Sequence, residues 1–158
     1  MASTTLSKAP TPMSNHVHVK LTETQEESEA IKELRIQVFV REQGAPLDEE
    51  FDEHDESAVH AVALIEGRVV GTGRMYELPS GETQIGRMAV EPRYRRDGIG
   101  GLMLVFLEEQ ARQLGVREVM LHAQTYVQSF YEQHGYVVDG KPFMEVDIEH
   151  VRMVKRLE

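Results

Sequence analysis

The stretch that decides the fold is RMAVEPRYRRDGIGGLMLVFLEEQARQL, residues 87–114. Its first residues predict the end of a β-strand, and residues 99–114 have the apolar spacing of an amphipathic helix. Three glycines lie where the helix begins: Gly98, Gly100 and Gly101. Because glycine has no side chain, the amide N–H groups of this first turn are open to a ligand, and a helix N-terminus attracts anions. Positive charge beside the turn comes from three arginines, Arg93, Arg95 and Arg96. The turn therefore predicts a phosphate site.

Other glycine turns fit this stretch less well. A Rossmann turn has a third glycine and an acidic residue about 20 positions later. Here Leu121-His122 stands at the end of the next predicted strand. A P-loop has Lys and then Ser or Thr after its last glycine, whereas Leu102 follows Gly101. A helix start without any ligand remains as an alternative, but it does not explain the three neighbouring arginines.

The composition limits the classes of protein to which the chain can belong. Its 158 residues fit one domain, which we predict for residues 16–158. Residues 1–15 are rich in Ser, Thr and Pro, lack the apolar run of a signal peptide, and are predicted to form a flexible tail. No apolar segment is long enough for a membrane span, and the absence of cysteine excludes disulfides and thiol catalysis. We therefore expect a cytoplasmic protein with no membrane partner.

Charge narrows the classes further. The net charge of −10 disfavours a nucleic-acid partner, because affinity for nucleic acid depends on neutralising phosphates. Acidic residues crowd one stretch: Asp48, Glu49, Glu50, Asp52, Glu53, Asp55 and Glu56. Such a run is usually a solvated loop, and the alternative is a rim that attracts a cationic amine. His54 lies within the run, but adjacent residues rarely converge on one ion, so we predict no metal site.

Hydrophobic periodicity and turn residues predict the order of the elements. Strands are predicted at residues 16–21, 58–65, 68–78, 82–90 and 118–123. Helices are predicted at residues 24–40, at 99–114, and between Thr125 and Gly135. The first and third begin with capping-box patterns: Thr24 with Glu27, and Thr125 with Gln128. Residues 136–139 and 143–157 supply either two further strands or one kinked strand.

The connections predict the fold class. Short loops make the first four strands antiparallel, whereas the helix between the fourth and fifth strands makes that pair parallel. We predict a single α/β domain with a mixed, mostly antiparallel sheet of about six or seven strands, flanked by about four helices. Gly71 and Gly73 mark a β-bulge or the close approach of another backbone. The predicted core stripe of the 99–114 helix is Ile99, Leu102, Met103, Phe106, Leu107, Ala111 and Leu114.

Two motifs resemble those of one protein family. The first is Arg95-x-x-Gly98-x-Gly100 after Met88-Ala89-Val90, and the second is FYEQHGY at residues 130–136. In this order they resemble the GNAT superfamily of N-acetyltransferases, over residues 17–157. Shorter stretches resemble its ElaA/YjcF-like branch, at residues 40–43, 85–90, 121–124 and 150–153.

The resemblance implies acetyl-CoA as the acetyl donor and no metal. Its pyrophosphate would lie on the backbone amides of Arg95, Arg96, Asp97, Gly98, Ile99, Gly100 and Gly101. Its pantetheine arm would pair with the strand backbone at Met88, Ala89 and Val90, where the fourth and fifth strands splay apart. A backbone N–H in the Met88–Ala89 region would polarise the thioester carbonyl. Gln124 stands where many members have an Asn that contacts the pantetheine arm.

The resemblance also implies catalytic residues. Tyr131 matches the family tyrosine near the thioester sulfur, where its hydroxyl would protonate the departing thiolate. Helical spacing alone would make Tyr131 a core aromatic. The acceptor amine has to lose a proton, because alkyl amines have pKa values of about 10.4. Many members place a Glu on the fourth strand for this purpose, but this chain has Gly86-Arg87 there.

Three residues are candidate substitutes for the missing base: His122, Glu145 and His150. We favour His122, because a histidine at the end of the fifth strand can titrate near neutral pH. The alternative is a structural role, which is commoner for a lone histidine on a strand.

These inferences predict an acetyl-CoA-dependent N-acetyltransferase. The acetyl group would pass directly to a primary amine of a small molecule or a peptide. The alternative is a non-catalytic acyl-CoA-binding sensor or regulatory module, which the missing acidic residue at Gly86-Arg87 favours. Because relatives often pair, a homodimer is also expected.

Overall fold

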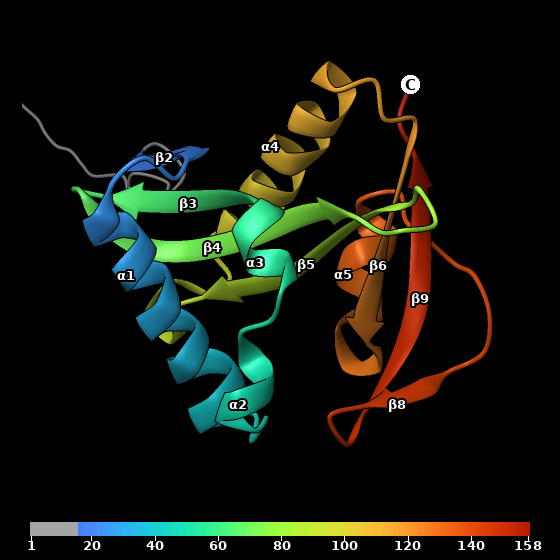
Figure 1. The fold of residues 1–158 in the computed structure, drawn as a ribbon, viewed down its shortest axis with the longest axis horizontal. Helices are drawn as coiled ribbons and strands as arrows, with labels where there is room; N and C mark the ends of the chain where they lie inside the picture. Colours follow the sequence, from blue (N-terminus) through green and yellow to red (C-terminus); the bar gives the residue numbers. More distant parts are fainter. Residues whose placement is uncertain (1–15) are drawn as a thin grey trace, which may run out of the picture.

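The structure is a computed structural model that describes residues 16–158, and Figure 1 shows its fold. The predicted tail at residues 1–15 lies outside the described residues. Across residues 16–158, no helix combines the length and apolarity that a bilayer crossing needs.

Eight strands form one sheet. They are β2 (Val17–Leu21), β3 (Val59–Ile65), β4 (Arg68–Glu77), β5 (Thr83–Val90), β6 (Glu118–Gln124), β7 (Val137–Val138), β8 (Phe143–Glu145) and β9 (Ile148–Arg156). Their order is β2-β3-β4-β5-β6-β9-β7, and β8 pairs with β9 outside this path. Within residues 16–158, β5 and β6 are the one parallel pair, as predicted. The sheet has one strand more than seven because residues 143–157, predicted as one strand, form two, β8 and β9.

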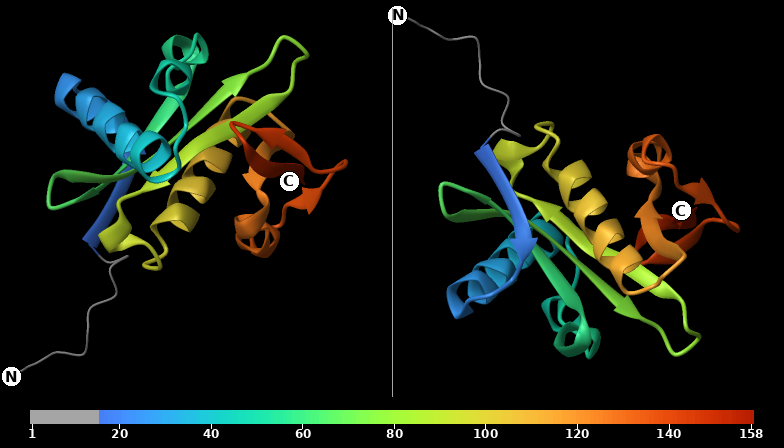
Figure 2. Two further views of the ribbon diagram at one scale, coloured as in Figure 1. Left: turned by 90° about the horizontal axis from the view of Figure 1, so that it is seen from below. Right: turned by 90° about the horizontal axis from the view of Figure 1, so that it is seen from above.

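The helices cover both faces of the sheet (Figures 1 and 2). On one face lie α1 (Gln25–Arg35), its continuation as the π-helix η2 (Ile36–Glu42), α2 (Leu47–Glu50) and α3 (His54–Ser57). On the other face lie α4 (Ile99–Gln113) and α5 (Gln128–Gln133). Short 3-10 turns, η3 (Pro92–Tyr94) and η4 (Thr125–Val127), precede α4 and α5. The layered α/β fold is the predicted class, and the described chain has α2 and α3 where a loop was predicted.

The two predicted capping boxes have different outcomes. Before α1, the Glu27 N–H donates to the Thr24 hydroxyl (3.1 Å) and the Glu27 carboxylate accepts from the Thr24 N–H (3.3 Å), which confirms this box. The box of Thr125 and Gln128 is wrong, because the chain enters α5 through η4 without a side-chain cap. The Thr125 hydroxyl instead donates to Glu149 of β9 (3.1 Å), a partner that only the fold brings near.

Helix α4 packs on the sheet with a face rotated from the predicted stripe. Four stripe residues are buried as predicted: Ile99, Met103, Leu107 and Ala111. The predictions for Leu102 and Leu114 are wrong, with 37% and 69% of their surface exposed, whereas Leu104 is buried. Glu108 is also buried, because the Tyr136 hydroxyl (2.8 Å) and the Lys155 ammonium (2.9 Å) donate to its carboxylate. A stripe based on apolar spacing cannot include a buried, paired glutamate.

The end of the chain forms a hairpin rather than one kinked strand. β8 and β9 are antiparallel, and the two residues between them, Val146 and Asp147, have φ values of +45° and +62°. Positive φ at both central positions matches the right-handed twist of the flanking strands. Glu145 is the last residue of β8, so this tight turn determines its position.

Strand β5 contains a bulge opposite Gly73 of β4. The matched pairs on its two sides are Thr72 with Ala89 and Arg74 with Gly86. Between these pairs, Gly73 alone opposes both Arg87 and Met88, and Arg87 has a φ of +51°. A Cβ on Gly73 would lie 2.5 Å from the Met88 sulfur, so a larger residue would force Met88 to move. The predicted bulge is confirmed at Gly73.

The bulge changes the direction and the faces of β5. Because successive strand residues point to opposite faces, one extra residue reverses the pattern beyond it. Met88 packs toward α4, whereas Ala89 packs toward α1 and η2. β5 pairs with β6 through Thr83 and Gln84, and beyond them the two strands diverge (Figure 1). The diverging stretches, residues 85–90 and 121–124, are termed the β5–β6 fork, and they confirm the predicted splaying.

The rotated face of α4 predicts different costs for two leucines on this helix. Leu104→Ala should lower the free energy of unfolding by about 3 kcal/mol, because it leaves a cavity in the core. Leu102→Ala serves as the matched control and should cost less than about 1 kcal/mol. Urea denaturation followed by circular dichroism measures both values. Equal losses would show that the predicted stripe, and not the structure, describes the buried face.

Candidate active site

The β5–β6 fork leaves strand backbone available to a ligand. Beyond Gln84, the edge of β5 that faces β6 has no strand partner within residues 16–158. An extended molecule can add to such an edge through main-chain hydrogen bonds. The residues predicted to contact the pantetheine arm, Met88, Ala89 and Val90, lie on this part of β5. The fork therefore fits an extended, amide-containing arm.

The glycine turn follows this part of β5 and η3, where α4 begins. Gly98 precedes α4 with a φ of +82°, a conformation that glycine adopts without strain. A Cβ on Gly101 would lie 2.8 Å from Nε2 of His134, which caps α5, so packing requires glycine there. A Cβ on Gly100 would make an ordinary contact, 3.5 Å from the Phe130 ring. Conformation and packing thus explain Gly98 and Gly101, whereas Gly100 leaves room beside the first-turn amides, as an anion site requires.

The three arginines before the turn differ in their contacts. Arg95 forms a two-point ion pair with Glu42 of η2 (Nη1–Oε2 3.0 Å and Nη2–Oε1 2.9 Å), and its Nε donates to the Val90 carbonyl (2.9 Å). The Nε atom of Arg93 donates to the Glu91 carboxylate (3.0 Å). Arg96 has a φ of +75° and forms no ion pair with any described residue. Arg95 therefore ties the turn to η2, and Arg96 is the arginine whose side chain is free to meet a phosphate.

Tyr131 lies on α5 among aromatic side chains. Its ring packs edge-on against Phe130 and Tyr136, with ring centres 5.0 Å and 5.9 Å apart. Burial raises the pKa of the Tyr131 hydroxyl to about 12, so this group stays protonated at neutral pH. Tyr131 is half-buried and packs against the core, and its hydroxyl forms no hydrogen bond with any described residue. The O–H therefore remains able to donate to a ligand.

Two of the three candidate bases meet in one hydrogen bond. His122, on β6 just beyond the last β5–β6 pair, has its Nδ1 atom 3.0 Å from Glu145 Oε1. This hydrogen bond lowers the pKa of the Glu145 carboxyl, although burial acts in the opposite direction. His150 is buried, and its Nδ1 lies 2.7 Å from the Ile148 carbonyl oxygen. The sequence offered the three residues as alternatives, whereas the structure makes His122 and Glu145 partners.

Gln124 joins two elements that are distant in sequence. Its Nε2 donates to Oε1 of Gln43, the residue that ends η2 (2.9 Å). Through Gln43 and Glu42, η2 is therefore connected both to β6 and to the glycine turn. Sequence reasoning missed both connections, although residues 40–43 belong to a stretch that resembles the ElaA/YjcF-like branch.

Comparison with known proteins identifies the family. Residues 21–157 match the family model of the acetyltransferase (GNAT) domain. The chain belongs to the GNAT acetyltransferase family. YjcF of Bacillus subtilis, described as an uncharacterized N-acetyltransferase, is 36% identical over 123 residues, which cover 77% of this chain and 87% of YjcF.

Solved structures share this GNAT fold. A candidate N-acetyltransferase from Lactobacillus plantarum has a TM-score of 0.83 and 30% identity, covering 91% of this chain and 100% of that one. ElaA of Escherichia coli has a TM-score of 0.78 and 23% identity, covering 88% of this chain and 99% of ElaA. The predicted family, the similarity to YjcF and ElaA, and the fold class are thereby confirmed. The enzyme class that follows is acyltransferase.

In this GNAT protein, three acidic residues of the predicted loop lie in ion pairs with arginines of α1, β4 and β5. The pairs are Arg35–Glu50 (2.9 Å), Arg35–Asp55 (2.7 Å), Arg74–Asp52 (2.7 Å), Arg74–Asp55 (2.8 Å) and Arg87–Glu50 (3.1 Å). The prediction of a solvated loop is therefore wrong for Glu50, Asp52 and Asp55. The remaining four acidic residues are exposed: Asp48, Glu49, Glu53 and Glu56.

A signal for this network was present in the sequence. Arg35 follows Leu34 on the apolar side of α1, and Arg74 lies within the apolar strand β4. Both arginines are buried, and a buried charge needs a partner of opposite sign. Two arginines at core positions therefore predict that nearby carboxylates fold back onto them.

The arginines shift the pKa values of the carboxyls that they contact. The hydrogen bond from Arg74 lowers the pKa of Asp52. Burial by itself would raise the pKa of Asp55, but the hydrogen bond from Arg35 and the charge of Arg74 hold it well below its usual range. These carboxylates therefore stay ionised and paired at neutral pH. Among residues 16–158, no three His, Asp or Glu side chains are arranged as a metal site.

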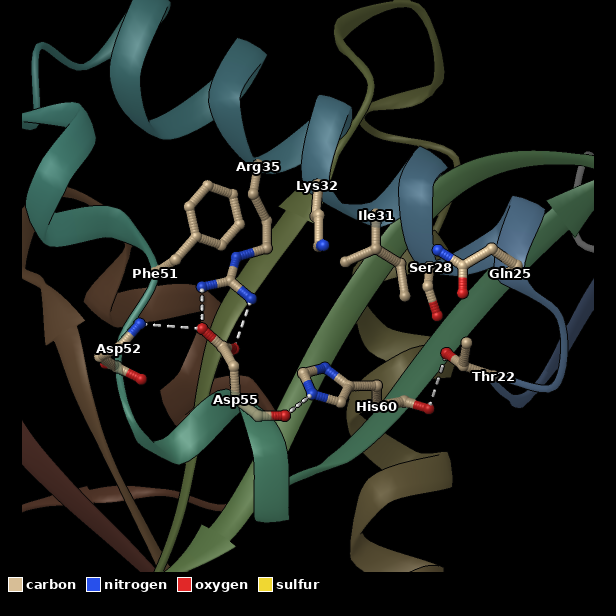
Figure 3. A pocket seen from close by; sticks show the side chains of 10 residues that line it. All are labelled: Thr22, Gln25, Ser28, Ile31, Lys32, Arg35, Phe51, Asp52, Asp55 and His60. Atoms are coloured by element: carbon tan, nitrogen blue, oxygen red, sulfur yellow. Dashed lines mark hydrogen bonds and ion pairs between the residues drawn. The ribbon is translucent and has the colours of Figure 1, made fainter.

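A separate cavity of about 530 Å³ lies between α1, α3 and β3 (Figure 3). Arg35 and Asp55 line it, and Nε2 of His60 lies 2.8 Å from the Asp55 carbonyl oxygen. Because His60 is paired with Arg74 and Arg74 with Gly86, strand β4 stands between this cavity and the fork. None of the candidate catalytic residues lines it, so the cavity is distinct from the candidate active site.

Removing one carboxylate of the network should weaken the fold. We expect Asp55→Asn to lower the free energy of unfolding by about 2 kcal/mol at neutral pH, because Arg35 and Arg74 each lose one of two carboxylate partners. Folding lowers the pKa of Asp55 below its ordinary 3.8. The stability that the ionised Asp55 adds to the fold is therefore present above about pH 3.8 and is lost as the pH falls. Asp55→Asn should therefore lose less stability than the wild type between about pH 5 and pH 2.

Urea denaturation across this pH range measures both effects. Glu53→Gln is the matched control, because the Glu53 side chain is 88% exposed in the same segment. It should leave stability nearly unchanged. An equal loss in both variants would contradict the role of the ion pairs.

Proposed function

We propose that the protein transfers an acetyl group from acetyl-CoA directly to a primary amine of a small molecule or a peptide. The observation that carries this proposal is the β5–β6 fork, whose free strand edge leads into the glycine turn of α4. Coenzyme A combines an extended amide-containing arm with a pyrophosphate, which suits the edge and the turn together. A solved aminoglycoside 6′-N-acetyltransferase in complex with coenzyme A has this fold, with a TM-score of 0.73 and 16% identity, covering 88% of this chain and 96% of that one.

In this proposal, the donor lies along the fork. The amides from Arg95 to Gly101 and the side chain of Arg96 hold the pyrophosphate. The backbone of residues 88–90 holds the pantetheine arm, and an N–H of the Met88–Ala89 region polarises the thioester carbonyl. Gln124 contacts the same arm. Its side-chain amide either gives up its hydrogen bond to Gln43 or keeps it and contacts the arm as well. The room beside Gly100 supports this placement, because packing within the chain does not require it.

The reaction moves one acetyl group and one proton. The amine nitrogen attacks the thioester carbonyl carbon, an N–C bond forms, and the C–S bond breaks. His122 accepts the proton that the nitrogen loses, and the departing thiolate takes a proton from Tyr131. The proton on His122 then returns through solvent to the Tyr131 oxygen, which restores both side chains, so that one proton moves in total from nitrogen to sulfur. Tyr131 is protonated at neutral pH, as this role requires, although its raised pKa makes the hydroxyl a weaker acid than a free tyrosine.

A second candidate function is a non-catalytic acyl-CoA-binding sensor or regulatory module. It is favoured by Gly86-Arg87, which replaces the strand glutamate common in the family. The Arg87 guanidinium is bound to the carboxylate (3.1 Å) and the carbonyl (3.0 Å) of Glu50, so β5 presents no proton acceptor there. The His122–Glu145 pair on the other side of the fork supports catalysis instead.

We further propose the setting in which the enzyme works. Residues 16–158 form a single acetyltransferase domain of a cytoplasmic homodimer, with no nucleic-acid, membrane or metal partner. The negative net charge supports the absence of a nucleic-acid partner. Sedimentation velocity at micromolar concentration, compared with the monomer mass of 18.0 kDa, tests the dimer.

Filling the space beside the glycine turn should block the donor. We expect Gly100→Val to weaken acetyl-CoA binding by at least about 100-fold, or about 2.7 kcal/mol, because its side chain would occupy the pyrophosphate position. Titration calorimetry measures the affinity, and thermal denaturation checks the fold. Val105→Ala, on an exposed position of the same helix, is the control. An unchanged affinity in Gly100→Val would refute the assignment of the turn.

Removing the Tyr131 hydroxyl should separate the two candidate functions. For an acetyltransferase, Tyr131→Phe should lower kcat by about 100-fold, because the thiolate loses its proton donor, while acetyl-CoA affinity changes by less than about twofold. Release of free CoA thiol with a panel of primary amines measures the rate. A wild-type protein that binds acetyl-CoA but releases no CoA with any amine would favour the sensor.

A further inference from the structure

The β8–β9 hairpin carries Glu145 to His122. Glu145 ends β8 and pairs with Ile148 of β9, and the tight turn at Val146 and Asp147 restricts its backbone. Its Oε1 atom lies 3.0 Å from Nδ1 of His122. A carboxylate can only accept a hydrogen bond, so Nδ1 is the ring nitrogen that carries the proton. A neutral imidazole with its proton on Nδ1 has a bare Nε2 atom.

Aromatic packing holds the His122 ring in one orientation. The ring meets Phe143 of β8 edge-on, with ring centres 4.9 Å apart. Phe143 in turn stacks on His150 of β9 at 5.9 Å. His122 and Gln124 are two residues apart on β6, so their side chains lie on the same face of the sheet, where Gln124 meets Gln43. Nε2 of His122 has no hydrogen-bond partner in the described part of the chain.

The charged neighbours of His122 are occupied elsewhere. Arg152, directly across on β9, binds Glu82 (2.6 Å) and Asp139 (3.1 Å). From β5, Arg87 binds carboxylates of the acidic segment. The buried ring of His150 donates its Nδ1–H to the Ile148 carbonyl of the hairpin. Among these groups Glu145 is the carboxylate bonded to His122, and this bond lowers the pKa of Glu145, which keeps it ionised.

We infer that Glu145 is a positioning residue that holds His122 with its proton on Nδ1, leaving Nε2 to accept the proton of the acceptor amine. This inference rests on the proposed acetyl transfer. The nitrogen proton of the attacking amine passes to Nε2 as the N–C bond forms, and the Glu145 carboxylate stabilises the resulting imidazolium. A hairpin residue thus supplies the negative charge that Gly86-Arg87 does not supply from β5.

The hydrogen bond can be tested in the free protein, without any substrate. Long-range ¹H–¹⁵N NMR spectra distinguish the two ring nitrogens of His122, which a His122→Gln variant assigns. We expect a protonated Nδ1 and a bare Nε2 in the wild type, and a mixture of tautomers in Glu145→Ala. A proton on Nε2 in the wild type, or an unchanged tautomer in Glu145→Ala, would overturn the inference. This readout stands even when no amine releases CoA, the outcome that would overturn the proposed transfer alone.

Kinetics with an active amine test the consequence. Glu145→Ala should lower kcat by about tenfold or more, with the amine KM within about twofold, and Glu145→Asp should recover part of the rate. Glu149→Ala on the same hairpin, which does not contact His122, should leave kcat and KM unchanged. A raised KM with unchanged kcat would overturn the inference, since Glu145 would then bind the acceptor.

Discussion

The one extra residue of β5 opposite Gly73 is the constraint on which the active region depends. It reverses the inward and outward pattern of the strand, so Met88 joins the α4 core while Ala89 packs under α1. The same irregularity turns β5 away from β6 after two paired residues and opens the fork. The positive φ of Arg87 costs about 1–3 kcal/mol, which the contacts of its guanidinium with Glu50 offset.

Charge pairing connects the rest of the molecule to this bulge. Arg35, Arg74 and Arg87 draw the acidic segment onto the sheet beside it, so a stretch of high charge becomes part of the packed structure. Each of these arginines contacts two carboxylates, so removing one partner leaves the network with an excess of one charge inside the protein. The use of Arg87 in this network also explains why β5 lacks a base, and the His122–Glu145 pair lies on the opposite side of the fork.

Much of the fold was predictable because its signals are local. The capping box of α1, the glycine turn before α4 and the strand periodicities each depend on residues within one element. Predictions failed where a distant partner decided the outcome. Leu102 is exposed, whereas the buried face of α4 includes Glu108. The partners of Glu108, Tyr136 and Lys155, come from the end of the chain. The Thr125 hydroxyl does not form the predicted capping box, and it donates instead to Glu149 of β9, which is distant in sequence.

The sequence by itself determined the order of the elements, the glycine turn at the start of α4 and the family motifs, because these follow from neighbouring residues. Only the tertiary structure decided which charges are paired. Arg95 and Glu42 are 53 positions apart, and His122 and Glu145 are 23 apart. Contacts over such separations depend on how strands and hairpins are arranged in space, which neither periodicity nor composition records. The pairing of His122 with Glu145, on which the proposed proton transfer relies, is therefore visible only in the folded chain.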